Sequence, residues 1–327
     1  TNVKKRMYLF GIFSHDVRIE QERRMVIRSS YLWNHNYTCS LHEILMNPNL
    51  TKDSDENCRF VYTFVLAGGG SNRPQVCYWG DDYCGTNISS YRLEKPPPNS
   101  SDALLHEWVE YNQDITFLNI HENMNGGKSE SWYTHASALV NFHPNSDDFK
   151  IDFIGKIDSD TILHIHNFFL WERTFEEFFF LDEQPQQQQS ANGTTTTTTY
   201  AQLDTPYAVF GTSKYRKDCA GRGSGYICDD PNFHAPLLWY GAFQMITKQL
   251  AKHAYLNETS LEQKQAAFMP SGEDLSFSNM IYDKYDNQTW PISLFIRRGM
   301  RRVFQHAPKT KDPIYCNKTY WLNALNQ

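Results

Sequence analysis

Apolar runs and amphipathic stretches alternate along the first half of the chain, and this pattern predicts alternating strands and helices. The apolar runs are continuous, which is typical of strands that are buried on both faces of a parallel sheet. The predicted strands lie at residues 7–13, 60–67 and 114–120, with another ending at Asp158, and the predicted helices lie at residues 17–33, 102–112 and 128–142. This order favours an α/β fold with a mostly parallel central sheet flanked by helices.

A polar tract rich in Gln and Thr, residues 182–199, interrupts this pattern. Such a tract cannot bury a core, so we expect a disordered surface loop there. Beyond it, the pattern predicts a strand near 207–211, an apolar segment at 237–247, and helices near 248–256 and 273–285. No clean boundary divides the chain, and we therefore expect a single domain over residues 1–327 that contains the loop.

The composition narrows the class of protein. Hydrophobic residues make up 40% of the 327 residues and aromatic residues 15%, which indicates a globular chain. The net charge is −6, which argues against a nucleic-acid partner because nucleic-acid binders carry a basic face. No run of 18 apolar residues is present, so no membrane span is predicted. The chain begins at Thr1, and we expect a targeting segment to precede it in the full-length protein.

Acceptor patterns for N-glycosylation indicate passage through the secretory pathway. The pattern Asn-x-Ser/Thr occurs eight times, at Asn36, Asn49, Asn87, Asn99, Asn192, Asn257, Asn287 and Asn317. Seven cysteines fit the same oxidising compartment. The spacing allows disulfides between Cys77 and Cys84, between Cys219 and Cys228, and between Cys39 and Cys58, which leaves Cys316 over.

Two carboxylates one residue apart follow an apolar run in the sequence FIGKIDSDTILH, residues 153–164. Ligands of parallel α/β sheets bind at the carboxyl ends of strands, which is where Asp158 and Asp160 are expected. Carboxylate oxygens suit Mg²⁺ and Mn²⁺, which keep positions open for phosphates. The alternative is a solvated turn without a metal.

Five short segments, in order, resemble those of glycosyltransferase family 31, which contains the β-1,3-galactosyltransferases, the β-1,3-N-acetylglucosaminyltransferases and Fringe. The similar segments are Glu22–Tyr31, Glu107–Ile115, Lys156–Asp160, Trp239–Gly241 and Gly272–Leu275. Two departures from the family pattern are that Ser159 replaces the middle Asp of Lys-x-Asp-Asp-Asp, and that Ser278 stands near the place of a usual Gly.

The resemblance implies a GT-A type, Rossmann-like fold and a metal-dependent, inverting transfer of a hexose or N-acetylhexosamine. The donor would be a UDP-sugar, the cofactor Mn²⁺ or Mg²⁺, and the acceptor a hydroxyl of a glycan, glycoprotein or glycolipid, with a β-1,3 linkage. It also implies the lumen of the Golgi or the ER, with an N-terminal type II membrane anchor that precedes this chain.

The same resemblance suggests roles for single residues. Asp158, Asp160 and His306 would hold the metal, and Asp274 would be the base that takes the proton from the acceptor hydroxyl. Glu273, beside Asp274 in the catalytic site, would shape the pocket or contact the acceptor. Glu273 and Asp274 also fit an ordinary helix N-terminus, where carboxylates are favoured by the helix dipole.

Further residues would contact the donor. Lys156, Asp158 and Gly241 are expected near it, although Gly241 equally fits tight backbone packing. Three arginines of the first helix would either bind the diphosphate or uracil of the donor or anchor the helix, and the sequence leaves both open: Arg23, Arg24 and Arg28.

Two other functions remain open from the sequence. Because Ser159 removes one carboxylate, the chain could be a sugar-binding or scaffolding protein that keeps the fold without catalysis. A metal-dependent phosphoesterase that uses the Asp pair is the third reading, but the multi-carboxylate or His-rich site of two-metal hydrolysis is not evident.

Overall fold

The computed structural model describes residues 6–32, 37–51, 58–68, 92–93, 95–111, 113–118, 128–142, 150–180, 207–215, 237–257, 273–286, 293–296 and 304–306. The strands are β1 (Met7–Phe13), β2 (Thr38–Ser40), β3 (Phe60–Ala67), β4 (Arg92–Leu93), β5 (Ile115–Leu118), β6 (Ile151–Asp158), β7 (Thr161–Leu163), β8 (Ala208–Tyr215), β9 (Leu237–Thr247), β10 (Ser293–Ile296) and β11 (Phe304–His306). The helices are α1 (Arg18–Ser29), α2 (Leu41–Met46), α3 (Asp102–Glu110), α4 (Lys128–Phe142), α5 (Ile165–Phe180), α6 (Lys248–Lys252) and α8 (Glu273–Asp286), with a short 3-10 helix η1 (Pro48–Thr51) and a π-helical turn η4 (His253–Asn257).

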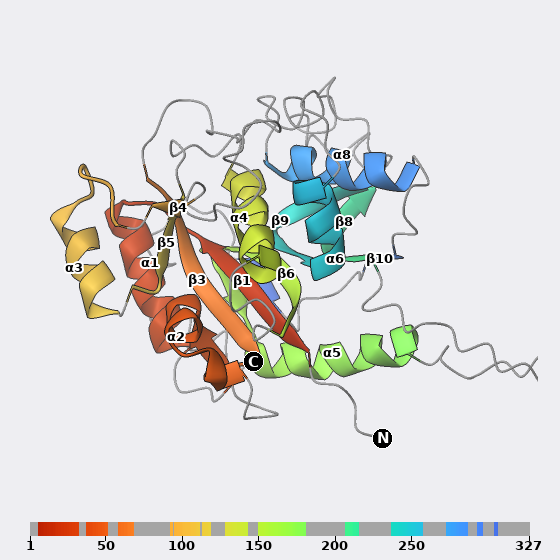
Figure 1. The fold of residues 1–327 in the computed structure, drawn as a ribbon, viewed down its shortest axis with the longest axis horizontal. Helices are drawn as coiled ribbons and strands as arrows, with labels where there is room; N and C mark the ends of the chain where they lie inside the picture. Colours follow the sequence, from red (N-terminus) through yellow and green to blue (C-terminus); the bar gives the residue numbers. More distant parts are fainter. Residues whose placement is uncertain are drawn as a thin grey trace, which may run out of the picture.

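The fold is α/β, with a mixed central sheet and helices on both sides (Figure 1). The strand order is β10-β8-β9-β6-β1-β3-β5-β4, and β2 pairs with β3. Five pairings of this sheet are parallel and three are antiparallel, so the parallel prediction applies chiefly to its N-terminal half. The direction changes at β6, which runs parallel to β1 and antiparallel to β9.

Apolar side chains fill the space on both faces of the sheet, as the continuous apolar strands predict. On one face, the even-numbered residues of β1 pack with α1, α3 and α5. On the other face, the odd-numbered residues of β1 pack with α2, α4, α6 and α8. Figure 1 shows β1, β3 and β6 crossing the middle of the molecule between these helices.

Two glycines allow large rings to approach the central strands. A Cβ atom on Gly11 would lie 2.5 Å from the indole of Trp132, and a Cβ atom on Gly155 would lie 2.1 Å from the ring of Phe10. The indole Nε1 of Trp132 also donates to the carbonyl oxygen of Gly155 at 2.8 Å. The close packing of α4 on β1 therefore depends on Gly11, and the position of the Phe10 ring over β6 depends on Gly155.

The Cys39–Cys58 disulfide is present and joins β2 to the turn before β3. The other proposed disulfides and the Gln/Thr-rich loop lie outside the described residues. Within the described part of the chain, no helix combines the length and the apolar character that crossing a membrane requires.

Candidate functional site

The Asp158-Ser159-Asp160 segment, called the DSD turn here, links β6 to β7 at the carboxyl edge of the sheet. The backbone N–H of Ser159 donates to the carbonyl oxygen of Phe13 at 3.1 Å, which ties the turn to the end of β1. Both aspartates are partly exposed, and the Asp158 side chain keeps 33% of its surface accessible. The two carboxylates therefore lie at a strand end, where the Asp158 side chain reaches solvent and Oδ1 of Asp160 is buried.

Two buried lysines bring positive charge to the end of β1. The Lys156 ammonium lies 3.5 Å from Asp158 Oδ1 and 4.7 Å from the centre of the Phe13 ring. The Lys128 ammonium, at the start of α4, donates to the carbonyl oxygen of Ser14 at 2.6 Å. Both residues are 2% exposed. The carboxyl end of β1 is thus flanked by two buried cations, of which the sequence pointed only to Lys156.

The C-terminal strand β11 brings His306 next to the DSD turn. Strand β11 pairs antiparallel with β7, and His306 is opposite Thr161, which directly follows Asp160. The side chain of His306 is outside the described residues, so this places its backbone only. Among the described side chains, no group of three His, Cys, Asp or Glu residues is gathered as metal ligands would be.

Asp274, in the first turn of α8, is connected to the same region through β9. Gln244 donates from its side-chain nitrogen to Asp274 Oδ1 at 3.5 Å. Gln244 is also the register partner of Lys156, and directly opposed residues of antiparallel strands project to the same face. The sheet face that carries Lys156 therefore also carries Gln244, whose side chain contacts Asp274.

Two further predicted residues are placed by backbone alone. Gly241 lies on β9, two residues before Phe243, which pairs with Ile157 near the end of β6. Glu273 begins α8, and its side chain is outside the described residues. Ser278, one turn after Asp274, donates its hydroxyl to the Asp274 carbonyl oxygen at 2.5 Å.

A buried network of charges joins α1 to α3 and β5. Arg24 donates through Nε and Nη2 to both carboxylate oxygens of Glu107, at 2.8 and 2.7 Å. Arg28 donates in the same two-pronged way to Asp114, at 2.8 Å for each bond, and its Nη1 donates to Glu107 at 2.6 Å. Because buried hydrogen bonds engage all three guanidinium nitrogens of each residue, both arginines anchor the first helix.

The ionisation of this network follows from its contacts. Burial by itself raises the pKa of Glu107, but hydrogen bonds and charges of Arg24 and then Arg28 outweigh it and lower that pKa. Burial by itself lowers the pKa of Arg28, but Asp114 and Glu107 raise it above its ordinary value. Burial raises the pKa of Asp114, although Arg28 opposes the shift.

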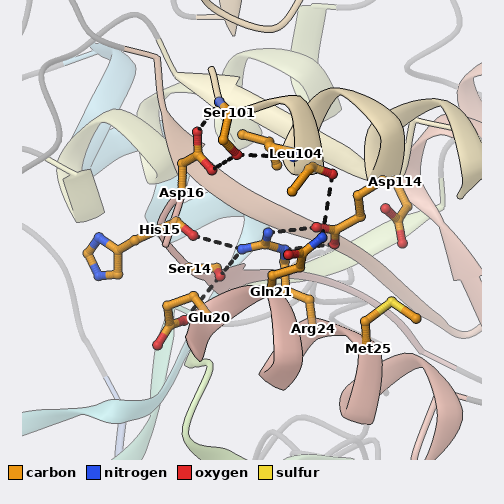
Figure 2. Close-up of polar contacts among 12 residues, drawn as sticks. Ser14, His15, Asp16, Glu20, Gln21, Arg24, Met25, Ser101, Leu104 and Asp114 are labelled. Carbon is orange, nitrogen blue, oxygen red and sulfur yellow. Dashed lines mark hydrogen bonds and ion pairs between the residues drawn. The ribbon is translucent and has the colours of Figure 1, made fainter. Parts of the chain in front are cut away.

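Arg24 also reaches the end of β1. Its Nη1 donates to Ser14 Oγ at 2.7 Å and to the His15 carbonyl oxygen at 2.8 Å (Figure 2). Nearby, Asp16 accepts two hydrogen bonds from Ser101, the residue that caps the N-terminus of α3 (Figure 2). The loop after β1 is therefore held by α1 through Arg24 and by the N-terminus of α3 through Ser101.

Among the three arginines, Arg23 differs from the other two. It is partly exposed and pairs with Glu20, one turn earlier on α1. The contacts of Arg24 and Arg28 favour the anchoring alternative for these two, whereas donor binding by Arg23 stays a prediction. Glu20, Lys128 and Gln244 were not among the residues predicted from the sequence. Each reaches the site through a contact with a residue that is distant from it along the chain.

No family model and no curated protein matches this chain.

Proposed function

We propose that this protein is a metal-dependent, inverting glycosyltransferase of GT-A type that moves a hexose or N-acetylhexosamine from a UDP-sugar to a glycan hydroxyl. One observation carries the proposal: Asp158 ends β6 and Asp160 follows it, next to β1, where the strand order reverses because β3 and β5 lie on one side of β1 and β6 lies on the other. In open α/β sheets, ligands bind outside the carboxyl ends of strands at such reversals of strand order.

The residues at the DSD turn fit a divalent cation. Two carboxylates on a partly exposed turn supply hard oxygen ligands and leave room for the phosphates of a nucleotide. His306, opposite Thr161 in the β7–β11 pairing, is the proposed third ligand. A bound Mn²⁺ or Mg²⁺ would supply charge stabilisation for the departing UDP. Lys156 would hold Asp158 in place by their contact and keep positive charge near the diphosphate.

Asp274 is proposed as the base that accepts the proton of the acceptor hydroxyl. Inversion in one step needs a base on the acceptor face and no covalent nucleophile on the enzyme. Gln244 would orient the carboxylate of Asp274 by its hydrogen bond, and Ser278 would fix the first turn of α8. The β-1,3 linkage, the Golgi or ER lumen and the type II anchor follow from the sequence resemblance alone.

The test is UDP release from a panel of UDP-sugars, with Mn²⁺ or with EDTA, by the wild type, Asp160→Ala and Asp102→Ala. Asp102 is an exposed carboxylate at the start of α3, so its variant is a matched control for loss of one charge. We expect Mn²⁺-dependent release that prefers one sugar, persists in Asp102→Ala and is lost in Asp160→Ala.

Other outcomes separate the alternative functions. UDP binding without release, over a broad panel of acceptors, would favour a sugar-binding or scaffolding protein. Release of phosphate from simple phosphoesters would favour a phosphoesterase. Unchanged release by a folded Asp160→Ala variant would contradict the metal site.

A further inference from the structure

Glu20 is a buried carboxylate that touches the DSD turn directly. It lies in the first turn of α1 and is 4% exposed. Its Oε2 accepts hydrogen bonds from Ser159 Oγ at 2.5 Å and from Ser14 Oγ at 3.1 Å, and its Oε1 pairs with Arg23. Figure 2 shows Glu20 beside Ser14, at the point where β1 leads into α1. One carboxylate therefore joins the ends of β1 and β6 to the first helix.

The direction of these hydrogen bonds is fixed by chemistry. A carboxylate only accepts, and a serine hydroxyl has a single proton to donate. Ser14 already accepts from Arg24, so its own proton is directed to Glu20. The proton of Ser159 is directed to Glu20 as well. Glu20 thus needs a hydrogen-bond donor at both places.

Ser159, the middle residue of the DSD turn, is held through both its backbone and its side chain. Its N–H donates to the Phe13 carbonyl oxygen, and its hydroxyl donates to Glu20. Bonds to a charged acceptor are stronger than bonds between neutral groups. With Ser159 fixed in this way, the backbone on each side of it, which carries Asp158 and Asp160, has a defined position.

We propose that Glu20 is a positioning residue for the DSD turn and that Glu20 and Ser159 form a matched pair. The proposal rests on the proposed function, because the turn is where the metal and the donor would bind. Ser159 is then the donor that Glu20 requires, and its presence is no sign of a lost metal ligand. A carboxylate at position 159 would bring a second negative charge against Glu20 in a buried place without a proton to donate.

The test compares the wild type with Ser159→Asp, Glu20→Gln and the double variant. Mn²⁺ binding in the presence of UDP is measured from the electron paramagnetic resonance signal of free Mn²⁺, which does not depend on turnover. We expect Ser159→Asp to weaken Mn²⁺ binding by about tenfold or more. We expect the double variant to recover to within about threefold of the wild type, because the amide introduced at position 20 donates a hydrogen bond.

The control is Glu22→Gln, which removes a more exposed charge from the same helix, one that pairs with Arg18. We expect Mn²⁺ binding by this variant to equal that of the wild type. Circular dichroism and thermal unfolding establish that each variant is folded. If Ser159→Asp does not fold, Ser159→Ala, Glu20→Gln and their combination form a double-mutant cycle. Because both single changes disrupt the same hydrogen bond, the combined loss must be smaller than the product of the two single losses.

The outcomes distinguish this proposal from the proposed function. A wild type that does not bind Mn²⁺ with UDP overturns both. A wild type that binds, together with equal or tighter binding by Ser159→Asp, overturns the matched pair alone, because the new carboxylate would then act as a ligand. Failure of the double variant to recover, or independent effects in the alanine cycle, also overturns it. The matched pair is supported if Ser159→Asp weakens Mn²⁺ binding and the additional Glu20→Gln change restores it.

Discussion

Arg24 and Glu107 form a two-pronged buried ion pair, with each carboxylate oxygen less than 3 Å from a guanidinium nitrogen. Arg24 is 1% exposed and Glu107 is 2% exposed. The pair joins α1 to α3, and Arg24 extends the connection to Ser14 at the end of β1. Removing one partner would leave the other charge buried without its compensation, which is costly.

Glu107→Gln should therefore destabilise the protein strongly. The amide has the shape of the carboxylate but leaves Arg24 and Arg28 without a full negative charge between them. We expect a loss of about 3 kcal/mol in the free energy of unfolding, measured by urea denaturation. The control is Glu110→Gln on the solvent side of α3, where the side chain is 54% exposed and pairs with His106. An equal loss in both variants would contradict the buried network.

The Glu107 carboxyl should also make the stability of the protein depend on pH in the acidic range. The pKa of Glu107 is lowered from its ordinary value of 4.5 in the folded protein, so protonation there favours the unfolded chain. Its contribution is complete above pH 4.5 and is lost as the pH falls below that value toward the folded pKa. The difference in melting temperature between wild type and Glu107→Gln should therefore be constant near neutral pH and shrink below 4.5.

This comparison isolates Glu107 from the other carboxyls. Burial raises the pKa of Asp114 and of Glu172, and these shifts act in the opposite direction. Asp114 and Glu172 are present in both the wild type and Glu107→Gln. The difference between the two melting temperatures therefore removes that part of their pH dependence which the substitution leaves unchanged. A difference in melting temperature that grows as the pH falls would contradict a lowered pKa for Glu107.

Gly155→Ala should disrupt the packing of the central strands β1, β6 and β9. The added methyl would lie 2.1 Å from a ring atom of Phe10 and 2.9 Å from the backbone oxygen of Gln244. Overpacking of a core costs about 1–3 kcal/mol, and the rigid ring and backbone place this site at the upper end. Thermal unfolding measures the loss, and Phe10→Leu in the Gly155→Ala background should recover part of it. No recovery would mean that the contact with the Gln244 backbone dominates.

The pattern of apolar and polar residues along the chain predicted the central elements, because the positions that are buried in these elements follow that pattern. Residues 7–13 and 60–67 form β1 and β3, and residues 128–142 form α4, as the apolar and amphipathic patterns indicated. The first helix ends at Ser29, earlier than predicted, because Ser30 leaves the helical backbone region with φ −117° and ψ −101°. No element was predicted over residues 165–180, where the structure has helix α5.

Pairings between distant segments could not be predicted from local pattern. The β7–β11 pairing, which brings His306 to the DSD turn, joins segments far apart in the chain. The change to antiparallel pairing at β6 likewise depends on β9, and it limits the prediction of a mostly parallel sheet. The contact between Glu20 and Ser159 has no sequence signal, because a buried glutamate near a helix N-terminus looks like any first-turn acid.

Asp274→Asn should separate catalysis from donor binding if Asp274 is the base. The amide keeps the size of the side chain and a hydrogen bond to Gln244, but it cannot accept a proton from the acceptor hydroxyl. We expect the rate of transfer to fall by about 10²–10⁴, the range for loss of a general base. Binding of Mn²⁺ with UDP should stay within about threefold of the wild type, because the DSD turn is untouched. In Asp160→Ala, by contrast, binding and transfer should both be lost. Transfer by Asp274→Asn at the wild-type rate would assign the base to another residue, and Glu273, its neighbour at the start of α8, is then the next variant to measure.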